Sequence, residues 1–180
     1  AFWNDPLEPG RLARLEKHQA ELHKARLLAE SAQERLARAR RLAPADPTLN
    51  SLVLAARLFD YLGMKWLYAV EWADYFRQLQ ANPETKLVDL YISNQINSQG
   101  HGMLADLREA ISGLKEPYRQ AWLEESTPYR LPSALMRFDA EWLYWQAVQQ
   151  AVTDKVLHGR SKSEPFPSIT VIRPARQTKE

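Results

Sequence analysis

The chain has 180 residues, of which 45% are hydrophobic and 26% are charged, so it can form one globular domain and is not a disordered chain. Its 24 Lys and Arg residues nearly balance 22 Asp and Glu residues, and the net charge of +2 gives no reason to expect nucleic acid as a partner. No apolar run reaches the roughly 20 residues that span a bilayer, and the absence of cysteine excludes disulfides and thiolate metal sites.

Residues 1–10 are predicted to be an N-terminal connector, because turn-forming residues crowd the segment Asn4–Gly10. The chain starts with Ala1, which favours a domain excised from a longer protein. A long helix is predicted over residues 11–42, where a heptad repeat forms a seam with alanine on one side. The members of this seam are Leu15, His18, Leu22, Ala25, Ala29, Ala32, Leu36 and Ala39.

The second helix is predicted to open at Asp46-Pro47, with Asp46 as the N-cap and Pro47 in the first turn. It extends past Phe76 and is rich in aromatic residues, so we expect it to be the central and most buried helix. Its predicted core positions are Leu49, Leu52, Val53, Ala56, Phe59, Trp66, Val70, Ala73 and Phe76.

A third helix is predicted to open at Asn82-Pro83-Glu84 and to continue to Leu114. Within it, the uncharged polar stretch Ser93–Gly102 contains two glycines, which cost about 1 kcal/mol each relative to alanine in a helix. We expect a kink or a close helix crossing there.

Pro117 is predicted to begin a further short helix, and the last helix is predicted to open near Pro132. This last helix has the most regular apolar repeat of the chain: Leu135, Phe138, Trp142, Trp145, Gln149, Val152 and Val156. Residues 159–180 read as an extended, Pro-containing basic tail, in which Ser168–Ile172 resembles a short strand. The predicted fold is therefore all-α: an antiparallel bundle of four to five long helices over residues 11–158, followed by the tail.

The sequence contains no complete catalytic motif. The four histidines lack the spacing of a metal-binding pair, and we expect His18 to be a hydrogen-bonded core or boundary residue of the helical seam. Gly100-His101-Gly102 lacks the lysine and the strand of a phosphate-binding loop, and no G-x-S-x-G motif is present. The sequence therefore predicts no metal, no cofactor and no catalytic residue.

Carboxylate pairs were considered because some hydrolases need only two acids. Asp139 and Glu141 are two residues apart on a helix and should point to different faces. Glu71 and Asp74 can share a face, where Lys65 and Arg77 would pair with them in a structural ion cluster.

Exposed aromatic side chains are the remaining candidates for binding. Most tryptophans fall at core spacing. Trp122, Tyr129 and Arg130 surround the turn at Thr127-Pro128 and form the best candidate set on the surface.

Residues 54–65 and residues 118–129, the latter followed by residues 135–139, carry a family resemblance. They resemble the helical region that follows the catalytic barrel of bacterial β-N-acetylhexosaminidase-like glycoside hydrolases related to family twenty. The opening Phe2-Trp3-Asn4-Asp5-Pro6 is similar to the exit from that barrel. The family uses an adjacent Asp-Glu pair on the barrel, and no such dipeptide occurs here, so none of its catalytic residues can be assigned.

The resemblance implies a non-catalytic accessory domain that braces the barrel of the same protein, with an amino-sugar glycan as ligand. It points to Trp122, Tyr129 and Arg137 at the rim of the sugar site, and to a periplasmic or secreted location. The alternatives are a free-standing scaffold that forms a homodimer along the alanine seam, and a self-sufficient helical enzyme or ligand carrier with a pocket near Ser93–Gly102.

Overall fold

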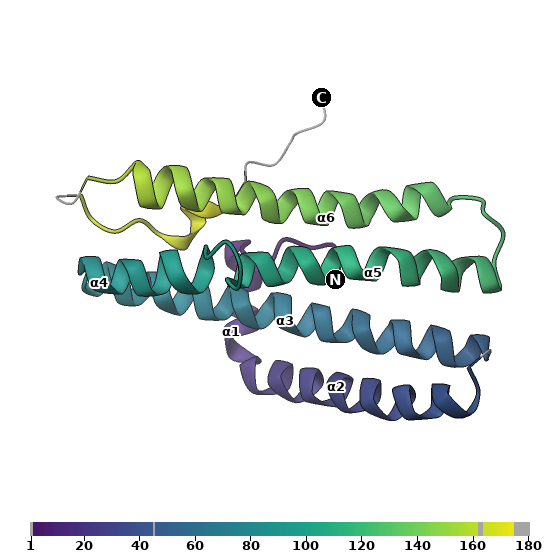
Figure 1. Cartoon of the computed structure of the whole chain (residues 1–180). Coiled ribbons are helices and arrows are strands. Elements are labelled where there is room, and N and C mark those ends of the chain that lie inside the picture. The colour runs from purple at the N-terminus through teal and green to yellow at the C-terminus, as the bar shows by residue number, and fades with distance from the viewer. Residues whose placement is uncertain (1, 45, 162–163, 175–180) are drawn as a thin grey trace.

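The computed structural model describes residues 2–44, 46–161 and 164–174, and these residues form helices and no strand. The predicted all-α class is thus confirmed. Figure 1 shows the four longest helices side by side, with the chain reversing direction from one to the next. They are α2 (Gln19–Leu42), α3 (Pro47–Ala81), α5 (Met103–Glu125) and α6 (Leu131–Ala151). No described helix has the length and apolar content that a membrane crossing requires.

The predicted first helix is two helices. α1 (Pro9–Lys17) ends at His18, which is exposed and has non-helical backbone angles, and α2 begins at Gln19. His18 therefore marks a bend and does not lie within a continuous seam. The leucine side of the predicted seam does face the bundle, since Leu15 and Leu22 are buried, but Ala25 is exposed.

The central position of α3 is confirmed, because α3 has more buried residues than any other described helix. Its N-terminus is capped as predicted: Asp46 Oδ1 accepts a hydrogen bond from Thr48 N at 2.8 Å. Two of its predicted core residues, Leu52 and Phe59, are nevertheless 48% and 65% exposed. The reason is that the described neighbours of α3 do not enclose all of its apolar surface.

After α3, the chain forms α4 (Thr85–Val88) and the wide π-helical segment η1 (Asp89–Ile96), then leaves the helix before α5 begins at Met103. The interruption lies inside the predicted stretch Ser93–Gly102.

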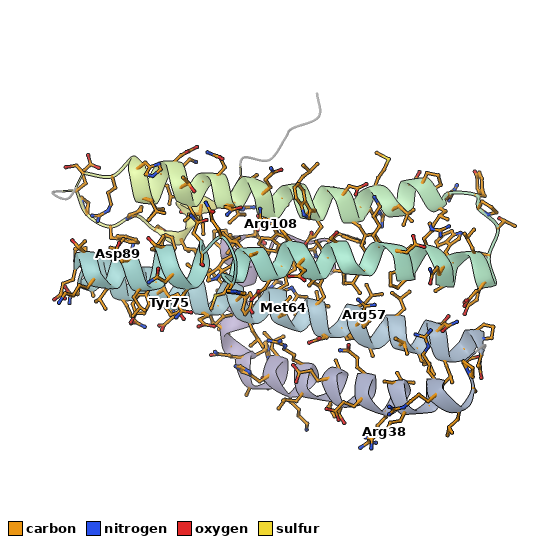
Figure 2. The ribbon with its side chains drawn as sticks, viewed as in Figure 1. Arg38, Arg57, Met64, Tyr75, Asp89 and Arg108 are labelled. Carbon is orange, nitrogen blue, oxygen red and sulfur yellow. The ribbon has the colours of Figure 1, made fainter. Side chains whose placement is uncertain are left out.

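The prediction that Pro117 starts a helix is wrong, because Pro117 lies inside α5. Proline cannot donate to the carbonyl four residues earlier, which here belongs to Gly113. Arg57 of α3, labelled in Figure 2, donates to that carbonyl instead. Its Nη2 lies 3.0 Å from Gly113 O, which satisfies the acceptor and lets the helix continue.

The last helix continues from α6 into the π-helical segment η2 (Val152–His158), and its predicted apolar repeat faces inward. The following tail is extended only in part: Ser168 and Arg173 have extended backbone angles, and a short turn lies between them. Residues 164–174 return to the bundle, and η3 (Ile169–Ile172) is a 3₁₀ turn where a strand was expected. The 3₁₀ spacing puts Ile169 and Ile172 on one side, and both are buried with Phe166. Residues 162–163 and 175–180 of the predicted tail lie outside the described residues.

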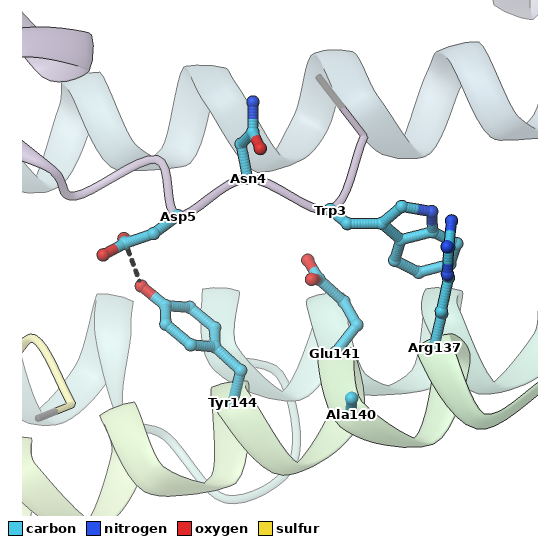
Figure 3. Close-up of a pocket in the computed structure, with 7 residues that line it drawn as sticks. All are labelled: Trp3, Asn4, Asp5, Arg137, Ala140, Glu141 and Tyr144. Carbon is cyan, nitrogen blue, oxygen red and sulfur yellow. Dashed lines mark hydrogen bonds between the residues drawn. The ribbon is translucent and has the colours of Figure 1, made fainter. Parts of the chain in front are cut away.

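The predicted N-terminal connector is also part of the folded structure over residues 2–10. Leu7 is fully buried, and Phe2 and Trp3 pack on the core. This segment crosses α3 and α6 before entering α1, and it forms one wall of the site described next (Figure 3).

Candidate functional site

Three of the four predicted binding residues stay together at the α5–α6 turn. Trp122 is half-buried, and its indole N–H donates to Thr127 O at 2.7 Å. Tyr129 is 73% exposed, and the guanidinium of Arg130 lies 5.3 Å from its ring centroid. Because the Trp122 N–H is already used, this group offers a ligand one exposed ring and one cation.

The fourth predicted residue, Arg137, lies elsewhere, further along α6. It lines a cavity of about 440 Å³ between α6 and the N-terminal segment. The cavity is lined by Trp3, Asn4, Asp5, Arg137, Ala140, Glu141 and Tyr144 (Figure 3). Aromatic, acidic, basic and amide groups therefore converge here on a single concave surface, so we treat this cavity as the candidate site.

Glu141 links the cavity to a buried polar network. Its Oε1 accepts hydrogen bonds from Lys65 Nζ at 2.6 Å and from Tyr61 OH at 2.9 Å. Tyr61 OH in turn accepts from Trp145 Nε1 at 2.8 Å. Lys65 also donates to the carbonyl oxygen of Phe2 at 2.9 Å, so the network joins α3, α6 and the N-terminal segment.

The charges in this network are almost completely removed from water. Lys65 is 1% exposed and Glu141 is 6% exposed. Burial lowers the pKa of Lys65, and the nearby Glu141 carboxylate opposes that shift. Burial, together with the Glu141 charge, raises the pKa of Tyr61 well above its usual value. Such a pair is costly to bury but even more costly to break, so it fixes Glu141 in position.

The second oxygen of this carboxylate faces the cavity. Glu141 Oε2 makes no hydrogen bond within the described part of the chain, and it is not among the buried polar atoms that lack a partner. Figure 3 shows the carboxylate directed toward the Trp3–Asp5 segment across the cavity. The site thus contains an immobilised acceptor that is open to a ligand.

Asp5 fastens the opposite wall. Its Oδ1 accepts from Tyr144 OH at 2.6 Å and from Leu7 N at 2.9 Å. Its Oδ2 pairs with Arg173, which brings the C-terminal segment to the same point. Burial raises the pKa of Tyr144, with Asp5 as the next cause, so the phenol remains the donor in this bond.

The predicted carboxylate geometry is partly correct. Asp139 points outward to Lys115, while Glu141 points inward, as two residues of separation requires. Arg77 does pair with Asp74, at 3.6 Å. The expected partner for Lys65 is wrong, however, because Lys65 binds Glu141 across the bundle.

A signal for this pair is present in the sequence. Glu141 comes three residues after Phe138 and four before Trp145, so it occupies the inner face of its helix. Lys65 occupies the corresponding inner position between Tyr61 and Trp72. One acid and one base placed in facing apolar seams predict a buried pair.

Neither a metal site nor a similarity to a known protein adds to this description. Over the described residues, no three His, Asp or Glu side chains are grouped in a way that could hold a metal ion. Comparison of the chain with protein-family models, with curated proteins and with solved structures gives no match.

Proposed function

We propose that the chain is a non-catalytic helical accessory domain of a β-N-acetylhexosaminidase-like glycoside hydrolase, packed against the catalytic barrel of the same protein. The observation that carries the proposal is an apolar stripe on α3 that is covered along only half of its length. In this proposal the whole protein is exported to the periplasm or out of the cell.

The stripe follows one face of α3 at alternating spacings of three and four residues. It consists of Leu52, Ala55, Phe59, Leu62, Trp66, Ala69, Ala73 and Phe76. The last three are at most 4% exposed, and Ala73 and Phe76 border the start of α1. The first five are exposed or half-buried. A regular apolar face of this kind normally packs against another helix or domain.

The position of Phe2 favours the barrel as that partner. The Phe2 ring lies 5.4 Å from Tyr61, and the Phe2 carbonyl accepts from Lys65, both on α3 where the uncovered half of the stripe ends. The family resemblance makes Phe2–Pro6 the exit from the barrel. A barrel attached there would start beside Leu52–Trp66.

A free-standing scaffold that dimerises through α2 is the second candidate. Leu27 and Leu28 of α2 are 65% and 62% exposed, and Ala25 next to them is exposed as well. In that case two copies of α2 would pair, and the oligomeric state would depend on protein concentration.

The two candidates are separated first by the gene and then by matched variants. Translation upstream of Ala1 in the same frame should give strand–helix repeats with an adjacent Asp-Glu pair; a start codon at that point would overturn the proposal. In the intact protein, Phe59→Ser should lower the thermal midpoint of the barrel, whereas Leu28→Ser should leave it unchanged. If Leu28→Ser instead abolishes a dimer and Phe59→Ser has no effect, the scaffold is the correct function.

A further inference from the structure

We propose that the cavity between α6 and residues 3–5 binds one polyhydroxylated ring, a neutral pyranose sugar, with a ring hydroxyl donating to Glu141 Oε2. The existence of the site is argued from its geometry. The choice of a sugar over other cyclic polyols rests on the proposed function.

The acceptor is better suited to a hydroxyl than to a cation. Glu141 is only 6% exposed. Its charge is already neutralised by Lys65, whose Nζ lies 2.6 Å from Oε1. A second cation would lose its hydration shell on entering the cavity. Because Lys65 already neutralises Glu141, no unpaired negative charge there would compensate that cost. A hydroxyl loses far less on leaving water, and it can donate to Oε2 at the ordinary distance.

A donor stands beside this acceptor on the same helix. Arg137 lies one helical turn before Glu141, the usual position for an ion pair, but Glu141 is held by Lys65 and no ion pair of Arg137 occurs among the described residues. Its guanidinium can donate to hydroxyl or ring oxygens. Asn4 lines the opposite wall, but its amide points away from Glu141 and Arg137 (Figure 3).

The same arrangement disfavours an anionic ligand. Arg137 would attract a carboxylate or a phosphate, but the free oxygen of Glu141 lies in the same cavity, and Asp5 forms part of its wall. An anion that fills the cavity would place its own acceptor oxygens against Glu141 Oε2, which can receive a hydrogen bond but cannot donate one. A neutral ring that both accepts and donates hydrogen bonds can pair with both Glu141 Oε2 and Arg137.

An aromatic wall completes the site. The Trp3 indole is held edge-on by Phe2 at 4.5 Å and by Phe138 at 5.1 Å between ring centroids. A fixed indole and the small Ala140 provide an apolar surface for the C–H face of a ring. The cavity volume of about 440 Å³ is at the lower end of the range for ligand sites, which suits a single ring better than an extended chain.

The experiment titrates the intact protein with four probes while tryptophan fluorescence and calorimetry report binding. The probes are the methyl glycosides of N-acetylglucosamine and of glucose, methyl glucuronide, and myo-inositol. We expect saturable binding of a neutral glycoside. Arg137→Ala should weaken it by about tenfold, which is the loss of one charge-assisted hydrogen bond. Arg38→Ala, an exposed arginine on α2 (Figure 2), is the matched control and should leave affinity unchanged.

Several results would overturn the inference. No saturable binding by any probe would remove the site, and tighter binding of the glucuronide would overturn the neutral ligand. Equal binding of inositol would overturn the choice of a sugar. Loss of binding in Tyr129→Ala but not in Arg137→Ala would move the site to the α5–α6 turn. Unfolding midpoints of all variants show whether the fold is intact.

This test is separate from the test of the proposed function. A barrel found upstream of Ala1 together with no sugar binding would leave the accessory role and remove the site. Sugar binding without a barrel would do the reverse.

Discussion

Gly102 is a position where the backbone itself leaves no room for a side chain. A Cβ placed there would lie 2.6 Å from Ser98 N and 2.9 Å from Ile96 O, both of them backbone atoms that cannot swing aside. Its φ of −83° is open to every residue, so the restriction comes from close packing of the chain before α5 and not from the backbone angle.

We therefore expect Gly102→Ala to lower the free energy of unfolding by about 1–3 kcal/mol, as overpacking does. The measurement is urea unfolding followed by circular dichroism. Gly100→Ala is the control, because a Cβ at Gly100 would meet nothing within 4 Å. Equal stability of the two variants would contradict the close packing.

The buried pair of Lys65 and Glu141 is the second feature at this scale. Lys65→Met should cost about 3–5 kcal/mol, because it leaves the Glu141 carboxylate buried without a counter-charge. Lys115→Met breaks the exposed pair with Asp139 and should cost only about 0–1 kcal/mol. Chemical denaturation of both variants tests the difference, and a similar loss in the two would mean that Glu141 is reached by water.

At the scale of elements, α5 depends on a contact from another helix. Arg57 of α3 donates a hydrogen bond to the carbonyl of Gly113, which Pro117 leaves without a backbone donor. Removing Arg57 should cost about 1 kcal/mol in the natural sequence. In a Pro117→Ala background the restored N–H can bond Gly113 O, so the same removal should cost less. A double-mutant cycle measures this coupling, and strictly additive effects would show that Arg57 does not support α5.

This contact also explains which elements could be predicted. The signal at Asp46-Pro47 is local, and the structure has the predicted cap. Pro117 also gave a local signal, but a side chain 60 positions away in the chain (117 minus 57) overrides it. Ser168–Ile172 has the composition of a strand, yet no described strand is available to pair with it, and its isoleucines instead enter the helical core.

The candidate site was only partly predictable for a similar reason. Arg137 was identified from the family resemblance, and the opposite faces of Asp139 and Glu141 followed from helix geometry. The role of Trp3 and Asn4 could not be predicted, because Pro and Asp around them indicate a connector. That segment is ordered by partners far away in the chain, of which Tyr144 is one.

At the scale of the whole molecule, buried tyrosines set the response to alkali. Burial raises the pKa of Tyr61 and Tyr144, and it raises the pKa of Tyr68 to about 12. Unfolded tyrosines ionise near pH 10, so above that pH the unfolded chain binds fewer protons than the native chain. The lowered pKa of Lys65 has the opposite effect on the pH dependence of the free energy of unfolding. This effect ends at about pH 10.4, where lysine in the unfolded chain also loses its proton.

The free energy of unfolding should therefore fall as the pH rises above about 10, by up to about 1.4 kcal/mol per pH unit for each of these tyrosines. Urea midpoints measured between about pH 8 and about pH 12 give the slope. Tyr61→Phe should reduce that slope, since it removes one of the groups. A midpoint that stays constant over this range would contradict the burial of the phenols.

The pairing of Asp5 with Arg173 has a mechanical consequence. Their side chains bond across a separation of 168 positions, so the first and last described segments of the chain meet at one place. Tension applied between these two residues would act across this contact first. No force would act on the four long helices, α2, α3, α5 and α6, until the contact broke. A single-molecule pull through these residues should peel the two end segments away at low force, whereas a pull along α3 would have to shear the helices past one another.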